Sequence, residues 1–147
     1  MIQIMKQAIT EAKKTRTDVP VGAIITLEGE IIAQAHNLKE DLNDVTAHAE
    51  ILAIREAQEK LKTWHLDNCE MYITLEPCPM CSWAILQSRI KTLYFGSYDS
   101  QYGGFSTKLD LKKVANSNMK IYGGIDEGEC DKLLEDFFTK IRGSKFW

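Results

Sequence analysis

Apolar residues recur every three to four positions at both ends of the chain. Near the start, the stripe consists of Ile2, Met5, Ile9 and Ala12. Near the end, it consists of Cys130, Leu133, Leu134, Phe137, Phe138 and Ile141. This spacing puts each stripe on one face of a helix. The pattern therefore predicts amphipathic helices over residues 2–15 and 127–141.

Short apolar runs between these helices predict strands, because they are flanked by turn residues and rich in β-branched side chains. The first two are VPVGAIIT (19–26) and EIIAQAHN (30–37), and Glu28–Gly29 between them is typical of a two-residue hairpin turn. Three shorter runs follow: MYITL (71–75), TLYFG (92–96) and MKIYG (119–123). Two more helices are predicted, one after Thr46 to about Lys62 and one over residues 79–89.

Strands that alternate with helices predict an α/β fold, and the opening hairpin predicts a mixed sheet. The chain has 147 residues, of which 44% are hydrophobic and 27% charged, which is ordinary for one soluble domain. It contains no repeat or linker-like tract, so we expect a single domain over residues 1–147.

Two observations bear on where the protein works. No apolar run approaches the about 18 residues that a membrane span needs, so no membrane association is expected. The first residues, MIQIMKQAITEAKK, lack the basic head, long apolar centre and small-residue cleavage site of a secretory signal. A cytoplasmic location is the resulting expectation.

The net charge of −3 does not by itself indicate a nucleic-acid-binding protein. The distribution is nevertheless uneven: residues 108–120 hold four lysines against one aspartate, and residues 140–147 hold three basic residues and no acid. Such runs usually form a solvated surface, although they can also contact phosphate. No DNA partner is expected.

The stretch LEPCPMC contains two cysteines three positions apart, Cys78 and Cys81. On the first turn of a helix they project to the same side, and Pro79 suits that turn because its missing N–H would have no partner there. The amide donors of a helix start favour thiolate, which zinc binds. Alternatives are a redox pair or two buried cysteines. Cys69 and Cys130, the other two cysteines, are expected in the core.

The stretch TAHAEILAIR places His48 and Glu50 at the start of a predicted helix, with Thr46 as its expected N-cap. Positions i and i+2 normally diverge around a helix, but side chains at its start lean back and can converge beyond its end. The alternative is a buried histidine beside a solvated glutamate.

Together, the two stretches suggest a catalytic centre. Three protein ligands, His48, Cys78 and Cys81, leave tetrahedral zinc one open position, where a water has its pKa lowered to about 7. A carboxylate that is not a ligand can take the proton of that water and deliver it elsewhere. Hydrolytic deamination requires such a shuttle, and Glu50 is the adjacent candidate.

The HAE and PCPMC motifs resemble those of the zinc-dependent cytidine and nucleobase deaminase superfamily. The resemblance is closer still to the bacterial tRNA adenosine deaminases. It extends over nearly the whole chain, in VPVGAII, AHN, TAHAEILAIR, YITLEPCPMC, SRIKTLYFGSYD and ECDKLLEDFF.

This resemblance implies a cytidine deaminase-like fold, in which a five-stranded mixed sheet lies between helices as three α/β/α layers. It implies one Zn²⁺ per chain, hydrolysis of the wobble adenosine of a tRNA anticodon to inosine, and a homodimer. The anticodon loop of tRNA is thus the implied partner. The implied zinc ligands are His48, Cys78 and Cys81, and Glu50 is the implied proton shuttle.

The same resemblance implies a set of substrate contacts. Asn37 would contact the base through its side chain, and main-chain groups around Ala49 and Pro77 would hold the base and its leaving amine. Asp99 would lie beside the flipped nucleotide. The last helix would approach the RNA loop through Phe137, Phe138, Lys140 and Arg142.

Several residues depart from the pattern of the resembled family. Val45 stands where proline is common, and Trp83 replaces a small residue after the second cysteine. Tyr98 and Gln101 stand where basic residues are common, and His36 replaces an aromatic residue and is expected to have a structural role.

Three other functions compete with this hypothesis. A deaminase of a small base, such as guanine or cytosine, would have the same zinc motifs. A non-catalytic zinc-containing subunit that binds RNA or a partner could dispense with Glu50. A redox C-x-x-C protein would hold no stoichiometric zinc.

Overall fold

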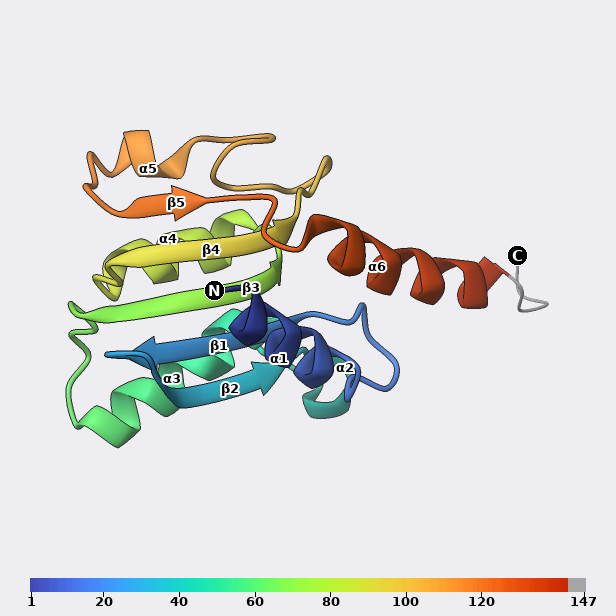
Figure 1. The fold of residues 1–147 in the computed structure, drawn as a ribbon, viewed down its shortest axis with the longest axis horizontal. Coiled ribbons are helices and arrows are strands. Elements are labelled where there is room, and N and C mark those ends of the chain that lie inside the picture. The colour runs from blue at the N-terminus through green and yellow to red at the C-terminus, as the bar shows by residue number, and fades with distance from the viewer. Residues whose placement is uncertain (143–147) are drawn as a thin grey trace.

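The computed structural model describes residues 1–142 of the chain. One sheet contains five strands in the order β2-β1-β3-β4-β5 (Figure 1). The strands are β1 (Gly22–Leu27), β2 (Glu30–His36), β3 (Cys69–Leu75), β4 (Thr92–Ser97) and β5 (Lys120–Tyr122). β1 pairs antiparallel with β2 and β3, whereas β3, β4 and β5 run parallel. The predicted mixed sheet is therefore confirmed.

Four helices cover the sheet, and two short ones lie in loops. The covering helices are α1 (Ile2–Ala12), α3 (Ala49–Leu61), α4 (Pro79–Gln87) and α6 (Glu127–Arg142). The short ones are α2 (Lys39–Leu42) and α5 (Leu111–Val114). Neither short helix was predicted, because four residues are too few to show a helical period.

The turn between β1 and β2 follows the prediction. Glu28 and Gly29 both have positive φ, 52° and 82°, as a two-residue type I′ hairpin turn requires. Glycine accepts this conformation without a steric penalty, whereas Glu28 must tolerate it. The turn pairs Leu27 with Glu30, and the register of the two strands then shifts by one residue between Ile25 and Thr26.

Two apolar layers, one on each face of the sheet, make up the core. Alternate residues of β1 point to opposite faces: Ile25 packs in the cluster that includes α3 and α4, and Ile24 packs with α1. Cys130 of α6 lies in the second cluster. Figure 1 shows α1 in front of the sheet, α3 and α4 behind it, and α6 starting at the strand ends and extending away from them. The predicted three-layer α/β/α architecture is confirmed.

The remaining cysteines and one histidine occupy structural positions. Cys69 and Cys130 are 1% and 0% exposed, which confirms the prediction that both are core residues. His36 Nδ1 lies 2.6 Å from Oε2 of Glu11, whose side chain is almost buried, so His36 ties β2 to α1. Among residues 1–142, no helix is long and apolar enough to cross a membrane.

Candidate active site

The histidine and the cysteine pair of the two motifs meet in space. His48 Nδ1 lies 3.7 Å from the Sγ atom of Cys78 and 3.4 Å from that of Cys81, although these residues are 30 and 33 positions apart. On a tetrahedral zinc ion, with bonds of about 2.3 Å to sulfur and about 2.0–2.1 Å to nitrogen, such ligand atoms lie about 3.6 Å apart. The three side chains therefore fit a zinc ion.

Two of these residues occupy equivalent positions on different helices. His48 is the N-cap of α3 and Cys78 is the N-cap of α4, and neither side chain caps its own helix. Both side chains are therefore free to project beyond the helix ends. Pro79 is in the first turn of α4, as predicted. The group lies where the chain leaves β3, at the carboxyl end of the parallel strands, the usual place for a site in such sheets.

The prediction that Thr46 caps α3 is wrong. Asp44 Oδ1 accepts hydrogen bonds from both the N–H and the hydroxyl of Thr46, at 2.8 and 2.7 Å. This local turn engages the Thr46 side chain and delays the helix until Ala49. His48 therefore precedes the helix, and the expected divergence of positions i and i+2 does not arise.

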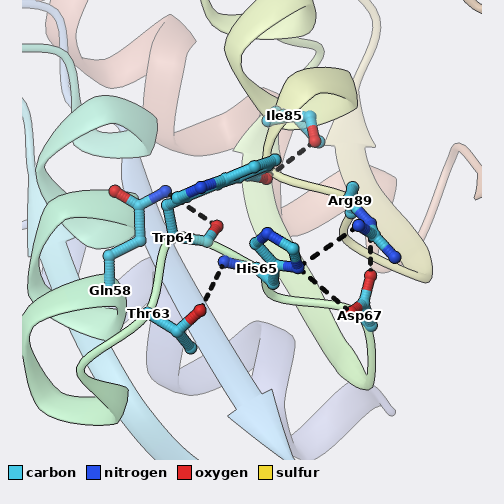
Figure 2. Close-up of polar contacts among 8 residues, drawn as sticks. Gln58, Thr63, Trp64, His65, Asp67, Ile85 and Arg89 are labelled. Carbon is cyan, nitrogen blue, oxygen red and sulfur yellow. Dashed lines mark hydrogen bonds and ion pairs between the residues drawn. The ribbon is translucent and has the colours of Figure 1, made fainter.

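A polar cluster fastens the loop after α3 to the far end of α4 (Figure 2). Gln58 of α3 donates to the carbonyl of Trp64, and Arg89 Nε lies 2.6 Å from Oδ1 of Asp67. Arg89 also lies 3.2 Å from Nδ1 of His65. These side chains are largely exposed, and such pairs contribute at most about 1 kcal/mol. They join the loop after α3 to the residues that follow α4.

Hydrogen bonding shifts the pKa values of the two thiols in opposite directions. A hydrogen bond from the Cys81 thiol, reinforced by His48, lowers the pKa of Cys78 to about 4 despite burial. The same hydrogen bond, together with burial, raises the pKa of Cys81. The hydrogen bond with Cys78 also raises the pKa of His48. The lowered pKa favours the thiolate form of Cys78, which is the form of cysteine that binds a metal ion.

Glu50 lies in the first turn of α3, directly beside this group, and is 5% exposed. Burial disfavours its charged form and raises the pKa of the carboxyl to about 7. A carboxyl with that pKa can both accept and release a proton near neutral pH. This is the property that a proton shuttle requires.

A cavity of about 710 Å³ opens above these residues. Its wall includes seven of the predicted site residues: Asn37, His48, Ala49, Glu50, Cys78, Asp99 and Phe138. It also includes residues that the sequence analysis did not name as site residues, among them Val19, Lys39, Glu76 and Tyr102. Tyr98 and Gln101, two of the departures from the family pattern, line it as well.

Asn37 is held in place by the backbone around it. Its side-chain N–H donates to the carbonyl of Val19 at 3.1 Å, and its side-chain oxygen accepts from the N–H of Lys39 at 3.2 Å. An amide side chain has two donor hydrogens and two acceptor lone pairs. Asn37 therefore retains one donor and one acceptor that can face a base.

Asp99 and Pro77 are both engaged within the protein. Asp99 Oδ1 accepts from the N–H groups of Gln101 and Tyr102 at 3.0 and 3.1 Å. The carbonyl of Pro77 accepts from the N–H of Gly104 and, at 3.1 Å, from a serine hydroxyl. Pro77 does not line the cavity, so its predicted contact with the substrate stays a prediction.

Two further residues lie away from the cavity. Trp83 does not line it and is 43% exposed on the surface of α4. The side chain of Arg142 lies outside the described part of the structure. Its predicted RNA contact is thus a prediction only.

The sheet, the cavity and the His/Cys/Cys group beside a buried glutamate are features of a nucleobase deaminase. The comparison with protein families agrees: the chain belongs to the MafB19-like deaminase family, whose model matches residues 1–142. The predicted fold and enzyme class are therefore confirmed.

Individual relatives indicate which kind of deaminase the chain is most similar to. The chain is 43% identical to the tRNA-specific adenosine deaminase of Bacillus subtilis (strain 168) over 145 residues, covering 96% of this chain and 90% of that protein. It is 44% identical to the tRNA-specific adenosine deaminase of Aquifex aeolicus (strain VF5), covering 95% of both. A structure from studies of A-to-I editing by tRNA:A34 deaminases has a TM-score of 0.88, with 38% identity over 91% of this chain and 100% of that one. The resemblance to tRNA adenosine deaminases is confirmed.

Proposed function

We propose that this protein hydrolyses the wobble adenosine of a tRNA anticodon to inosine, using one zinc ion per chain. The observation that carries the proposal is the convergence of His48, Cys78 and Cys81 beside the buried Glu50, at the base of a cavity of about 710 Å³. The relatives named tRNA-specific adenosine deaminases, which match over nearly their full length, support the choice of substrate.

The donor set favours zinc, because two cysteines and one histidine are its preferred ligands. Zinc bound there would supply a Lewis acid that lowers the pKa of the attacking water. Glu50 would accept a proton from that water and deliver it to the ring nitrogen next to the reacting carbon. The water oxygen adds to this carbon, the amino group takes a proton and leaves as ammonia, and the base becomes hypoxanthine. Water and adenosine thus give inosine and ammonia.

An anticodon loop suits this cavity on energetic grounds. Bases in a single-stranded loop can turn outward without the cost of opening a duplex. Asn37, the main chain of Ala49, Asp99 and Phe138 line the cavity and are proposed to contact the flipped nucleotide or its neighbours. Phe138 is 42% exposed, so its ring is available to a base. Lys108, in the segment between β4 and α5, and Lys113, in α5, are both exposed and are proposed to contact phosphates.

The decisive assay compares an anticodon stem-loop carrying a wobble adenosine with free adenosine, guanine and cytosine. Inosine formation in the stem-loop alone is expected, because only the RNA reaches both the metal group and the rim of the cavity. Product nucleosides are separated and quantified after digestion. A matched stem-loop with guanosine at the wobble position is the control. Turnover of guanine or cytosine without turnover of the stem-loop would assign the chain to the small-base deaminases.

We also propose that the protein is a cytoplasmic homodimer. Met80 and Trp83 on α4 are 38% and 43% exposed, and two large apolar side chains on one short helix fit a contact with a second copy. Trp83→Glu is expected to convert the dimer to a monomer in sedimentation velocity. Tyr122→Glu, which alters an exposed ring on β5, is the control and should stay dimeric. A monomeric wild-type protein would contradict this part of the proposal.

A further inference from the structure

The carboxylate of Glu76 is the most heavily hydrogen-bonded side chain that the described residues contain. Glu76 is 1% exposed and directly follows β3, two positions before Cys78. Its Oε1 accepts from the N–H of Asp99 at 3.1 Å and from the hydroxyl of Thr107. The other oxygen, Oε2, accepts from the N–H of Phe105 at 3.2 Å.

Two neighbouring residues complete the set of donors. Ser106 donates to Oε2 through its N–H at 3.0 Å and its hydroxyl at 3.3 Å. The N–H of Thr107 donates to the same oxygen at 3.2 Å. All donors come from residues 99–107, a segment without helix or strand between β4 and α5. Among residues 1–142, no basic side chain forms an ion pair with Glu76.

We propose that Glu76 is a positioning residue for the substrate: its carboxylate holds residues 99–107 as the wall of the cavity. That the bound group is an RNA nucleotide rests on the proposed function. The segment includes Asp99, Ser100, Gln101 and Tyr102, which all line the cavity. Without the carboxylate, the donors from Phe105, Ser106 and Thr107 lose their common acceptor.

The loop is shaped around this carboxylate. Gly103 approaches so closely that a Cβ atom at this position would collide with the Glu76 carboxylate. The N–H of Gly104 donates to the carbonyl of Pro77, which also ties the loop to the residue that precedes Cys78. One side chain thus links the substrate wall to the segment that carries Cys78. A carboxylate serves this role better than an amide, because it is acceptor-only on both oxygens.

The test is Glu76→Gln, which keeps the size of the side chain and places an NH₂ group against donors. The KM for the stem-loop is expected to rise about ten- to a hundredfold, the effect of losing a hydrogen bond to a charged group. The value of kcat should change much less, and zinc content should stay at one per chain. Hydrogen exchange should accelerate at the amides of residues 105–107 and not in α3.

Two variants keep the test decisive. Glu70→Gln alters a glutamate within β3 that accepts a hydrogen bond from Tyr94 and does not line the cavity, so it should leave KM and exchange unchanged. Thr107→Val removes a single donor, so it decides the question if Glu76→Gln fails to fold. Thr107→Val should raise KM and accelerate hydrogen exchange at the same amides. When it is combined with Glu76→Gln, it should add little to the effects of Glu76→Gln alone.

The outcomes separate the two proposals. The positioning role would be overturned if the amides of residues 105–107 exchange no faster in Glu76→Gln than in the wild type. It would also be overturned if these amides exchange faster while KM stays unchanged. A Thr107→Val protein with wild-type KM would overturn it as well. If the wild-type protein leaves the stem-loop unchanged, the proposed function is wrong. The exchange comparison needs no substrate and would still decide whether Glu76 holds the wall.

Discussion

Glu50→Ala is expected to abolish inosine formation while the metal ion stays bound. Glu50 supplies no ligand atom to the His/Cys/Cys group, so its removal leaves the metal ligands intact. The substitution does remove a carboxyl whose pKa burial raises to about 7. General acid–base catalysis contributes about a hundred- to ten-thousandfold to a rate, and here one group serves several proton transfers. Single-turnover inosine formation and zinc stoichiometry measure the two properties separately.

A matched control exists in the same helix. Glu56→Ala also removes a glutamate from α3, but its side chain is exposed and does not line the cavity. This variant should keep wild-type activity and wild-type zinc content. Substantial activity in Glu50→Ala would rule out the shuttle. Zinc and RNA binding without turnover in the wild-type protein would instead favour the non-catalytic subunit.

Cys81→Ala is expected to remove both the metal and the activity. Cys81 is 0% exposed and contributes one of three ligand atoms, leaving only His48 and Cys78 after substitution. Zinc affinity depends on the ligand count, and two protein ligands rarely hold it. The zinc-free protein should also unfold at a lower temperature than the zinc-loaded wild type, because ligands that bind only the native state stabilise it. Metal analysis and calorimetry test both statements.

Cys130→Ala provides the comparison, because Cys130 is equally buried and lies in the core cluster with α1. It should cost some stability, since its sulfur packs against Gly96, yet keep zinc and turnover. Full zinc occupancy in Cys81→Ala would refute the proposed ligand set. Equal zinc loss in both variants would point to general unfolding instead. Protein that binds no zinc in any form would revive the redox hypothesis.

Local patterns predicted most of the elements, because each depends on neighbours a few positions away. The apolar stripe of residues 127–141 matches α6, and the Glu28–Gly29 pair matches the first turn. Predicted helix ends were less accurate: α3 begins at Ala49 and α1 ends at Ala12. At these ends hydrogen bonds compete, as between Asp44 and Thr46, and periodicity does not detect such competition.

The stripe of α6 also shows a limit of periodicity. Its members share a helical face but not an environment: Cys130 is fully buried, whereas Phe138 is 42% exposed beside the cavity. In Figure 1 the helix begins against β4 and extends beyond the strand ends. Spacing alone cannot distinguish a residue that packs on the sheet from one that reaches a substrate.

The sequence by itself predicted the chemistry that we propose for this protein, namely which side chains would bind zinc and which would carry a proton. It also predicted the order of the strands and of the longer helices along the chain. Only the tertiary structure decided that His48 and Cys78, 30 positions apart, are N-caps that converge, and that Glu76 gathers a distant loop into the cavity wall. The physical reason is the distance along the sequence over which these interactions act. Residue type and spacing describe interactions within a few positions, whereas the site is built from hydrogen bonds and packing between segments that only folding brings together.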